Sequence, residues 1–175
     1  MNKIQLTALV RLIVAALCLG VTGCGSVSVT VQSTKDAQAV HKVERLFVII
    51  NHGDLGGQSY SEDLAHNLRL ILSNPPPDLE IGIVSPLDLD EKQHGAKIKQ
   101  FKPDAVLVIR LTTAVLDPFG GYPILKYDAS LFDAMMKKRL WRGAVDNSGE
   151  GALVKLRMSK MAEVLVTQLR KDGFL

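Results

Sequence analysis

Residues 105–112 read AVLVIRLT, a run of aliphatic residues that is the clearest strand signal in the chain. Pro103 and Asp104 directly precede this run. A second run, residues 46–50 (LFVII), is apolar at every position, as expected for a strand that is buried on both faces. The two runs therefore predict two strands of one sheet.

Two helices and a third strand are predicted around these runs. Ser59 and Glu62 have the spacing of a capping box, which predicts a helix from there to about Ser73. Residues 80–84 (EIGIV) predict a short strand, and a helix is expected over residues 89–101. The resulting order, strand-helix-strand-helix-strand, is typical of a parallel sheet covered by helices.

The pattern changes after this third strand of the series. Residues 122–134 and 138–145 predict the two strands of a hairpin. Residues 152–171 predict a final helix with one apolar side. We therefore expect a single α/β sandwich domain over residues 44–175, with a mixed sheet of about five strands and three helices in the order β-α-β-α-β-β-β-α.

The first 23 residues predict a secretory signal peptide. Lys3 and Arg11 precede residues 12–21 (LIVAALCLGV), which are all apolar. Ten apolar residues are too few to span a bilayer, for which about 20 are needed. A basic start, a short apolar run and small residues before a cleavage site describe a signal peptide. A buried core helix is the alternative, but no polar residue divides the run into a helical stripe.

The composition excludes several classes of protein. The chain has 175 residues, of which 21 are basic and 18 acidic, and it has 2 cysteines. This balance excludes a strongly basic nucleic-acid binder and an acidic disordered chain, and 2 cysteines are too few for a disulfide framework. Without Lys3 and Arg11, the basic residues fall to 19 against 18 acidic ones. The mature protein is therefore close to neutral.

Residues 21–24 (VTGC) resemble the lipobox of bacterial lipoproteins. The resemblance implies cleavage between Gly23 and Cys24, a diacylglycerol on the Cys24 thiol, and a further acyl chain such as palmitate on the new amino terminus. Two or more acyl chains hold a protein durably at a membrane, whereas one does not. The alternative is an ordinary thiol or disulfide partner, but signal removal takes Cys18 away and leaves Cys24 no cysteine to pair with.

The residues directly after the lipobox indicate to which membrane the protein is sorted. In the sorting pattern of many Gram-negative bacteria, Asp after the cysteine retains a lipoprotein at the inner membrane, so Gly25 and Ser26 imply the outer membrane, facing the periplasm.

Residues 24–43 predict the lipidated cysteine and a flexible tether, rich in small and polar residues. Residues 25–41, fully extended, reach roughly 55 Å. The alternative is a short edge strand in which Val27, Val29 and Val31 alternate with polar residues.

His52 and Asp54, after the apolar run at 46–50, are the candidates for a metal or hydrolytic site. The remaining histidines, His41, His66 and His94, do not complete an H-E-x-x-H or H-x-x-E-H pattern, and no C-x-x-C occurs. The ordinary interpretation is that all four histidines lie at the surface. We therefore expect no catalytic residue, no metal and no cofactor, and an enzyme that uses His52 and Asp54 is the alternative.

A basic cluster is the candidate for partner contact. Lys137, Lys138, Arg139 and Arg142 surround Trp141 in the predicted hairpin. Such a cluster suits an anionic glycan or phospholipid headgroups. The alternative is a charged hairpin that prevents pairing at the edge of the sheet.

The hairpin also has a family likeness. Residues 127–134 (YDASLFDA) and 138–143 (KRLWRG) look like the strand-turn-strand of several envelope proteins, and residues 102–108 (KPDAVLV) resemble their entry to a central strand. The similar proteins are small outer-membrane lipoproteins of unassigned function. More distant ones are the N-terminal domain of the Tol-system periplasmic protein, lipoprotein activators of penicillin-binding proteins, and the curli secretion lipoprotein. The turn departs from them, with residues 135–137 (MMK) where they commonly place Thr-Gly.

This resemblance implies a non-catalytic α/β domain that is used for protein contacts in the periplasm. Together with the predicted anchor, it indicates a lipid-anchored cell-envelope lipoprotein that acts as a binding, assembly or regulatory factor. The expected partners are the membrane, through the acylated Cys24, and an envelope protein, but no nucleic acid.

Overall fold

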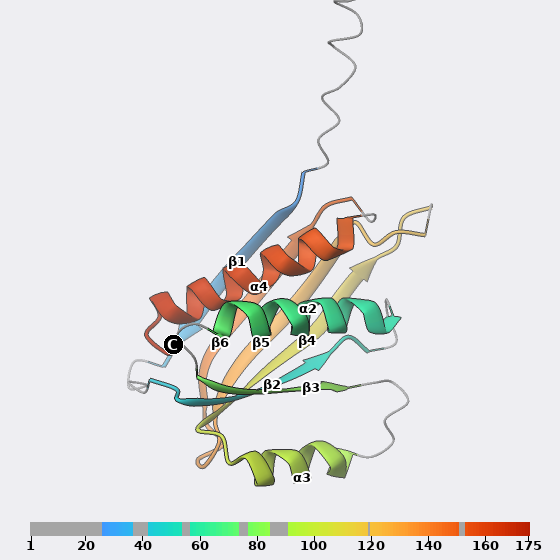
Figure 1. Ribbon diagram of the computed structural model, residues 1–175. Helices are drawn as coiled ribbons and strands as arrows, with labels where there is room; N and C mark the ends of the chain where they lie inside the picture. The colour runs from blue at the N-terminus through green and yellow to red at the C-terminus, as the bar shows by residue number, and fades with distance from the viewer. Residues whose placement is uncertain are drawn as a thin grey trace, which may run out of the picture.

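The computed structural model describes residues 26–36, 42–53, 57–73, 77–84, 91–118, 120–150 and 153–175. The predicted signal peptide, its predicted cleavage site and Cys24 lie outside these residues. The described chain forms one mixed sheet with helices on both faces (Figure 1). In chain order the elements are β1 (Ser28–Lys35), β2 (Arg45–Asn51), α2 (Gly57–Leu72), β3 (Asp78–Val84), α3 (Glu91–Phe101), β4 (Ala105–Val115), β5 (Ile124–Asp133), β6 (Arg139–Ser148) and α4 (Val154–Lys171).

The sheet confirms the predicted α/β class and adds one strand to it. Its six strands have the spatial order β1-β6-β5-β4-β2-β3. β2 pairs in parallel with both β3 and β4, as expected where helices connect the strands. β4, β5, β6 and β1 pair antiparallel in succession, so the predicted hairpin is confirmed as β5 and β6.

The sixth strand is β1, which lies in the segment predicted as a tether. Its eight residues pair with β6 from Ser28 opposite Ser148 to Lys35 opposite Trp141. Val29 and Val31 pack against the core, while the intervening residues are exposed. The tether prediction is therefore wrong for residues 28–35, and the edge-strand alternative is correct. The physical reason is that the alternation of valines buries one face of the strand once β6 provides a hydrogen-bonding partner.

Asp172 fastens β1 to the end of α4. Its Oδ2 accepts hydrogen bonds from Ser33 Oγ at 2.9 Å, Trp141 Nε1 at 2.7 Å and Gln168 Nε2 at 3.0 Å. Burial by itself raises the pKa of Asp172, but the hydrogen bonds from Gln168, Trp141 and Ser33 outweigh burial and lower that pKa below its usual value. A carboxylate thus joins the edge strand, β6 and α4 at one point.

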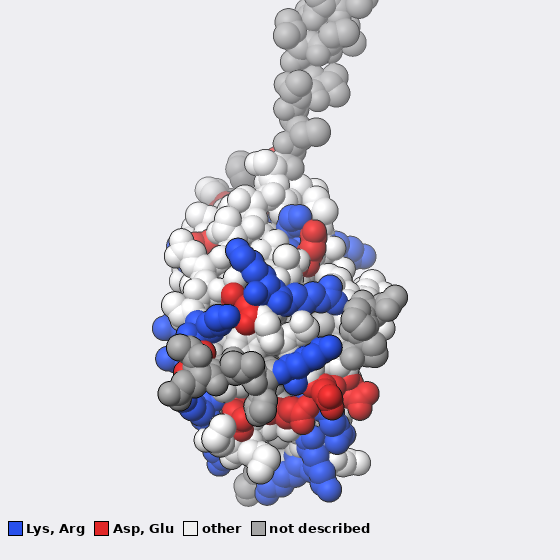
Figure 2. Space-filling view, turned by 90° about the vertical axis from the view of Figure 1, so that its left-hand side faces the viewer, with Lys and Arg blue, Asp and Glu red and all other residues white. Residues whose placement is uncertain are grey.

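The surface at the start of β1 carries few charges. Figure 2 shows charged side chains over the middle and lower parts of one side of the molecule, while the upper end, where the described chain begins, is mostly uncharged. Among the described residues, no helix is both long enough and apolar enough to cross a membrane.

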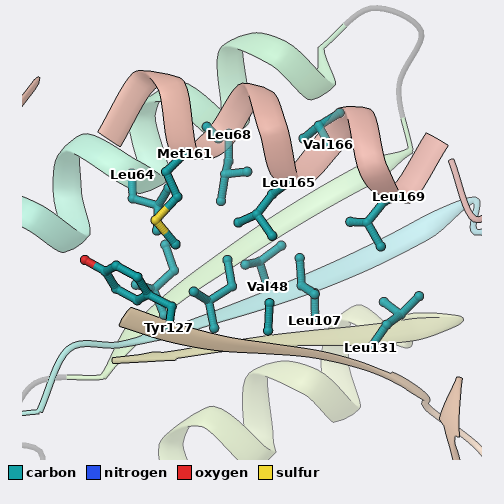
Figure 3. Packing of buried hydrophobic residues seen from close by; sticks show 14 of the residues in the cluster. Val48, Leu64, Leu68, Leu107, Tyr127, Leu131, Met161, Leu165, Val166 and Leu169 are labelled. Atoms are coloured by element: carbon teal, nitrogen blue, oxygen red, sulfur yellow. The ribbon is translucent and has the colours of Figure 1, made fainter. Parts of the chain in front are cut away.

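The core lies between the sheet and helices α2 and α4 (Figure 3). The sheet side chains that point toward these helices include Val48, Leu107, Tyr127 and Leu131, and they meet Leu64, Leu68, Met161, Leu165, Val166 and Leu169 from the helices. Leu156 of α4 does not belong to the buried side of this helix, since it is 55% exposed. The capping box predicted at Ser59 is also wrong, because α2 already begins at Gly57.

The second face of the sheet is covered in part. Phe101 of α3 packs on Phe47 of β2, with 6.0 Å between ring centroids, and the Arg45 guanidinium lies 4.9 Å from the Phe101 ring. On β4 and β6 this face is open, since Arg110, Arg142 and other side chains that point away from α2 and α4 are exposed. The open part of the sheet is where the candidate site lies.

Candidate functional site

A groove of about 530 Å³ lies on the open face of β4, β5 and β6. Successive side chains of a strand point to opposite faces of the sheet, so the residues that line the groove alternate with residues that face the core. The lining side chains are Val108, Arg110, Thr112, Asp128, Ser130, Phe132, Arg139 and Arg142. Three arginines and one aspartate give the groove a positive balance.

Asp128 is paired within the groove. Its Oδ2 accepts a hydrogen bond from Arg142 Nε at 2.6 Å, and Arg142 also contacts it through its second nitrogen. Ser130 Oγ donates to the other oxygen, Oδ1, at 2.9 Å. The Asp128 carboxylate is thereby held by two side chains, with Arg142 on Oδ2 through two nitrogens and Ser130 on Oδ1.

Arg110 and Arg139 are the two arginines of the groove without such a partner. Arg110 lies directly opposite Asp128 in the pairing of β4 with β5, but the Asp128 carboxylate forms its ion pair with Arg142. Within the described parts of the chain, neither Arg110 nor Arg139 has an ion-pair or hydrogen-bond partner for its guanidinium, and both are exposed. These two guanidinium groups are available to an anionic ligand.

The structure divides the predicted basic cluster between two faces. Trp141 is 1% exposed and lies on the side of α4, where its indole donates to Asp172. Lys138 pairs with Asp36 at 2.6 Å, and Lys137 lies in the exposed turn after β5. Of the five predicted contact residues, the groove contains only Arg139 and Arg142. The edge-strand interpretation of the hairpin is wrong, because β1 covers the free side of β6.

Gly143 explains why a tryptophan fits at the middle of β6. A Cβ atom on Gly143 would lie 2.4 Å from Cη2 of Trp141, closer than any real contact. The indole therefore lies across the glycine backbone. Residues 138–143, which carry the family likeness, therefore have a structural role in the core, and they also place Arg142 in the groove.

His52 is buried, contrary to the expectation of a surface histidine. Its Nδ1 lies 2.8 Å from Ser61 Oγ and its Nε2 lies 2.9 Å from Tyr127 Oη. Burial lowers the pKa of His52 from 6.5 to about 4, because the charged form would lose its hydration. The imidazole is thus neutral at physiological pH and engaged at both nitrogens.

This arrangement is unfavourable for the alternative of a metal or hydrolytic site that uses His52. A metal ligand needs a ring nitrogen with a free lone pair, and a general base needs a pKa near the working pH. Ser61, which is hydrogen-bonded to His52, is 3% exposed. Asp54 and His41 lie outside the described residues, as does the side chain of His94, while His66 is exposed on α2. No group of three potential metal-ligating side chains occurs in the described ranges.

Arg157 is a buried cation at the same end of the core as His52. Its Nε donates to Asn147 Oδ1 at 2.9 Å, and its two terminal nitrogens donate to the backbone carbonyls of Asn147 and Tyr122. Burial lowers the pKa of the Arg157 guanidinium, while Tyr60 and Tyr127 act in the opposite direction. The arginine joins α4 to the end of β6 and to the segment before β5.

Sequence reasoning missed Arg110, Asp128 and Ser130 as site residues. A signal for Arg110 was present, since it is the one charged residue in the apolar run 105–112. A charge at that point indicates that one face of the strand is open. The pairing of Asp128 with Arg142, 14 residues away, depends on the hairpin register and had no such signal.

The fold is similar to that of PelC. Two structures of the PelC dodecamer from Paraburkholderia phytofirmans match with a TM-score of 0.52 each, at 15% and 14% sequence identity, over 78% and 79% of this chain and 95% of that chain. Lipoprotein GNA1162 from Neisseria meningitidis matches with a TM-score of 0.41 at 15% identity, over 73% of this chain and 99% of that chain. No protein-family model matches the sequence, and no curated protein matches it. The likeness to PelC shows a shared fold.

Proposed function

We propose that this protein is a lipid-anchored, non-catalytic binding factor of the cell envelope, and that its groove binds an acidic segment of a partner protein. The observation that carries the proposal is that Arg110 and Arg139 have no partner among the described residues and lie in a groove whose single carboxylate is already held by Arg142. Arginine matches carboxylates by two parallel hydrogen bonds, so a chain of Asp or Glu side chains is the complementary ligand.

The walls of the groove support a peptide as the ligand. Val108 and Phe132 lie in the same groove as the arginines and are half-buried. They offer apolar surface to the methylene groups of acidic side chains. The hydroxyl groups of Thr112 and Ser130 donate within the protein, to the Lys126 carbonyl and to Asp128 Oδ1, so the hydrogen-bond donors left for a carboxylate ligand are the arginines. A buried apolar area with charges around it is common where proteins contact each other.

The anchor is the second part of the proposal. The lipobox-like residues 21–24 support acylation of Cys24, and Gly25 with Ser26 supports sorting to the outer membrane with the domain in the periplasm. The engagement of both ring nitrogens of His52 supports a non-catalytic role, because that histidine was the candidate base or metal ligand.

The anchor is tested by metabolic labelling with palmitate in a Gram-negative host. We expect the wild-type protein to be labelled, to lose residues 1–23 and to fractionate with the outer membrane, and we expect Cys24→Ser to lose the label and retain the signal. Cys18→Ser is the matched control, since Cys18 lies within the signal peptide. It should keep the label. Equal labelling of Cys24→Ser and wild type would contradict acylation at Cys24.

The groove is tested by titrating the protein with a fluorescent octaglutamate peptide and following fluorescence anisotropy. We expect Arg110→Glu combined with Arg139→Glu to weaken binding by about tenfold or more, because each hydrogen bond to a charged group contributes about 1.5–3 kcal/mol and 1.4 kcal/mol corresponds to a factor of ten. Added salt should weaken wild-type binding as well.

The control carries the same change in net charge on the opposite side of the molecule. Arg69→Glu combined with Lys155→Glu alters two exposed cations on α2 and α4 and should leave binding close to wild type. An equal loss in both double variants would show a net-charge effect instead of a groove. Binding of an anionic polysaccharide but not of the peptide would overturn the proposed ligand class.

A further inference from the structure

We infer that one end of the sheet contacts the membrane, with Val115, Leu116 and Ile124 against the lipid surface. The inference rests on the acylated Cys24 proposed above and concerns which surface the anchor brings to the lipid. The partner of this surface is the membrane leaflet that holds the acyl chains.

The first observation is the short connection between Cys24 and the sheet. β1 begins at Ser28, and the described chain begins at Ser26. The backbone of Ser26 and the side chain of Val27 lie against Gly149, since a Cβ there would be 3.2 Å from Ser26 O and 3.3 Å from a Val27 methyl group. Two residues of chain span at most about 7 Å, so an acylated Cys24 is held within that distance of Ser26.

The second observation is the register of the sheet. Ser28 lies opposite Ser148, Ser148 opposite Ile124, and Ile124 opposite Val115. These four residues form one row across β1, β6, β5 and β4. The anchor therefore reaches the sheet in the row that carries Val115 and Ile124, and Leu116 continues β4 beyond that row.

The third observation is the exposure of these apolar side chains. Leu116 is 61% exposed, Val115 is 42% exposed and Ile124 is 38% exposed. Leu156, in the first turn of α4 at the same end of the molecule, is 55% exposed. Neighbouring exposed apolar residues mark a surface that contacts a partner or a membrane. The side of this end seen in Figure 2 carries few charges, which lowers the cost of bringing it to lipid.

The opposite end of the sheet also has exposed apolar side chains, Met135 and Met136 in the turn after β5. Asp133 opens that turn and Ile124 begins β5, so the turn and the anchored row are separated by the full length of the strand. The anchor therefore selects the end that faces the lipid. With that end on the membrane, the strands run away from it and the arginine groove faces sideways into the periplasm.

The test uses spin labels in the acylated protein, reconstituted in vesicles of phosphatidylethanolamine and phosphatidylglycerol. After signal removal and acylation the chain has no free thiol, so one label is placed at Leu116→Cys and, as the matched control, one at Met135→Cys. We expect the label at 116 to be relaxed by oxygen, which concentrates in lipid, and to be shielded from a water-soluble nickel complex. The label at 135 should show the reverse.

Three outcomes decide between the interpretations. Equal access of the nickel complex to both labels, in protein whose acylation is confirmed by mass, would overturn the inference and leave the anchor intact. Absence of acyl groups in the mass spectrum would instead contradict the proposed anchor. Dipolar broadening at position 116 that disappears on dilution with unlabelled protein would assign the surface to a second copy of the chain and overturn the inference.

Discussion

Arg157→Ala is expected to lower the free energy of unfolding by about 3 to 5 kcal/mol. The substitution leaves Asn147 Oδ1 and the carbonyls of Asn147 and Tyr122 without their donor, and Asn147 is fully buried. It also leaves a cavity, because the Arg157 side chain is 0% exposed. Urea unfolding followed by circular dichroism measures the change through the midpoint and slope of the transition.

Two further variants separate the causes of this loss. Arg157→Met restores the packing of the side-chain stem but none of the hydrogen bonds, so it should recover a part of the lost stability. Lys155→Met, at an exposed position in the same turn of α4, should change stability by no more than about 0.5 kcal/mol. A loss below about 1 kcal/mol in Arg157→Ala would show that the buried guanidinium is not a structural link.

Stability is expected to fall by about 3 kcal/mol between pH 6.5 and pH 4 through His52 alone. The folded protein holds the pKa of His52 at about 4, whereas the ordinary value is 6.5. Between these values the unfolded chain binds a proton that the folded chain does not, so protonation favours unfolding as the pH falls. The stability that the neutral His52 imidazole contributes is fully present above pH 6.5 and is lost as the pH approaches 4.

The difference between wild type and His52→Gln isolates this effect, because the carboxylates that titrate in the same range are common to both proteins. The glutamine side chain has no titratable group, and it still offers hydrogen-bonding groups to Ser61 and Tyr127. The advantage of wild type should shrink as the pH is lowered, and His66→Gln, at an exposed position of α2, is the control for loss of a histidine as such. Parallel stability curves for wild type and His52→Gln from pH 7 to pH 4 would contradict the prediction.

Most of the elements could be predicted because their signals are local. The runs 46–50 and 105–112 are strands in the structure, and the hairpin at residues 124–148 and the last helix were predicted with bounds close to the observed ones. Residues 28–35 were predicted as part of a tether, with a strand as the alternative, because alternating valines form a strand only where another strand offers hydrogen bonds. That partner, Arg139–Ser148 of β6, is more than 100 residues away in the sequence.

The candidate site was predicted less well because its residues come together only in the sheet. Trp141 and Arg142 are adjacent in the chain, but the alternation of a strand places one in the core and the other in the groove. His52 was assigned to the surface from its loop position, and the tertiary structure instead buries it between Ser61 and Tyr127. A hydrogen-bond partner for a buried histidine has no fixed sequence spacing.

The sequence by itself determined the lipobox-like motif at residues 21–24, the near-neutral charge of residues 24–175 and the periodicities that make strands and helices, because each depends on the residues present or on a fixed repeat. Only the tertiary structure decided that β1 is the edge strand beside β6, which face of the sheet stays open and which arginines lack a partner among the described residues. Those features follow from strand register and from where helices find apolar surface to cover. Both are contacts between distant segments, and they place the groove of Arg110 and Arg139 opposite the face that α2 and α4 bury.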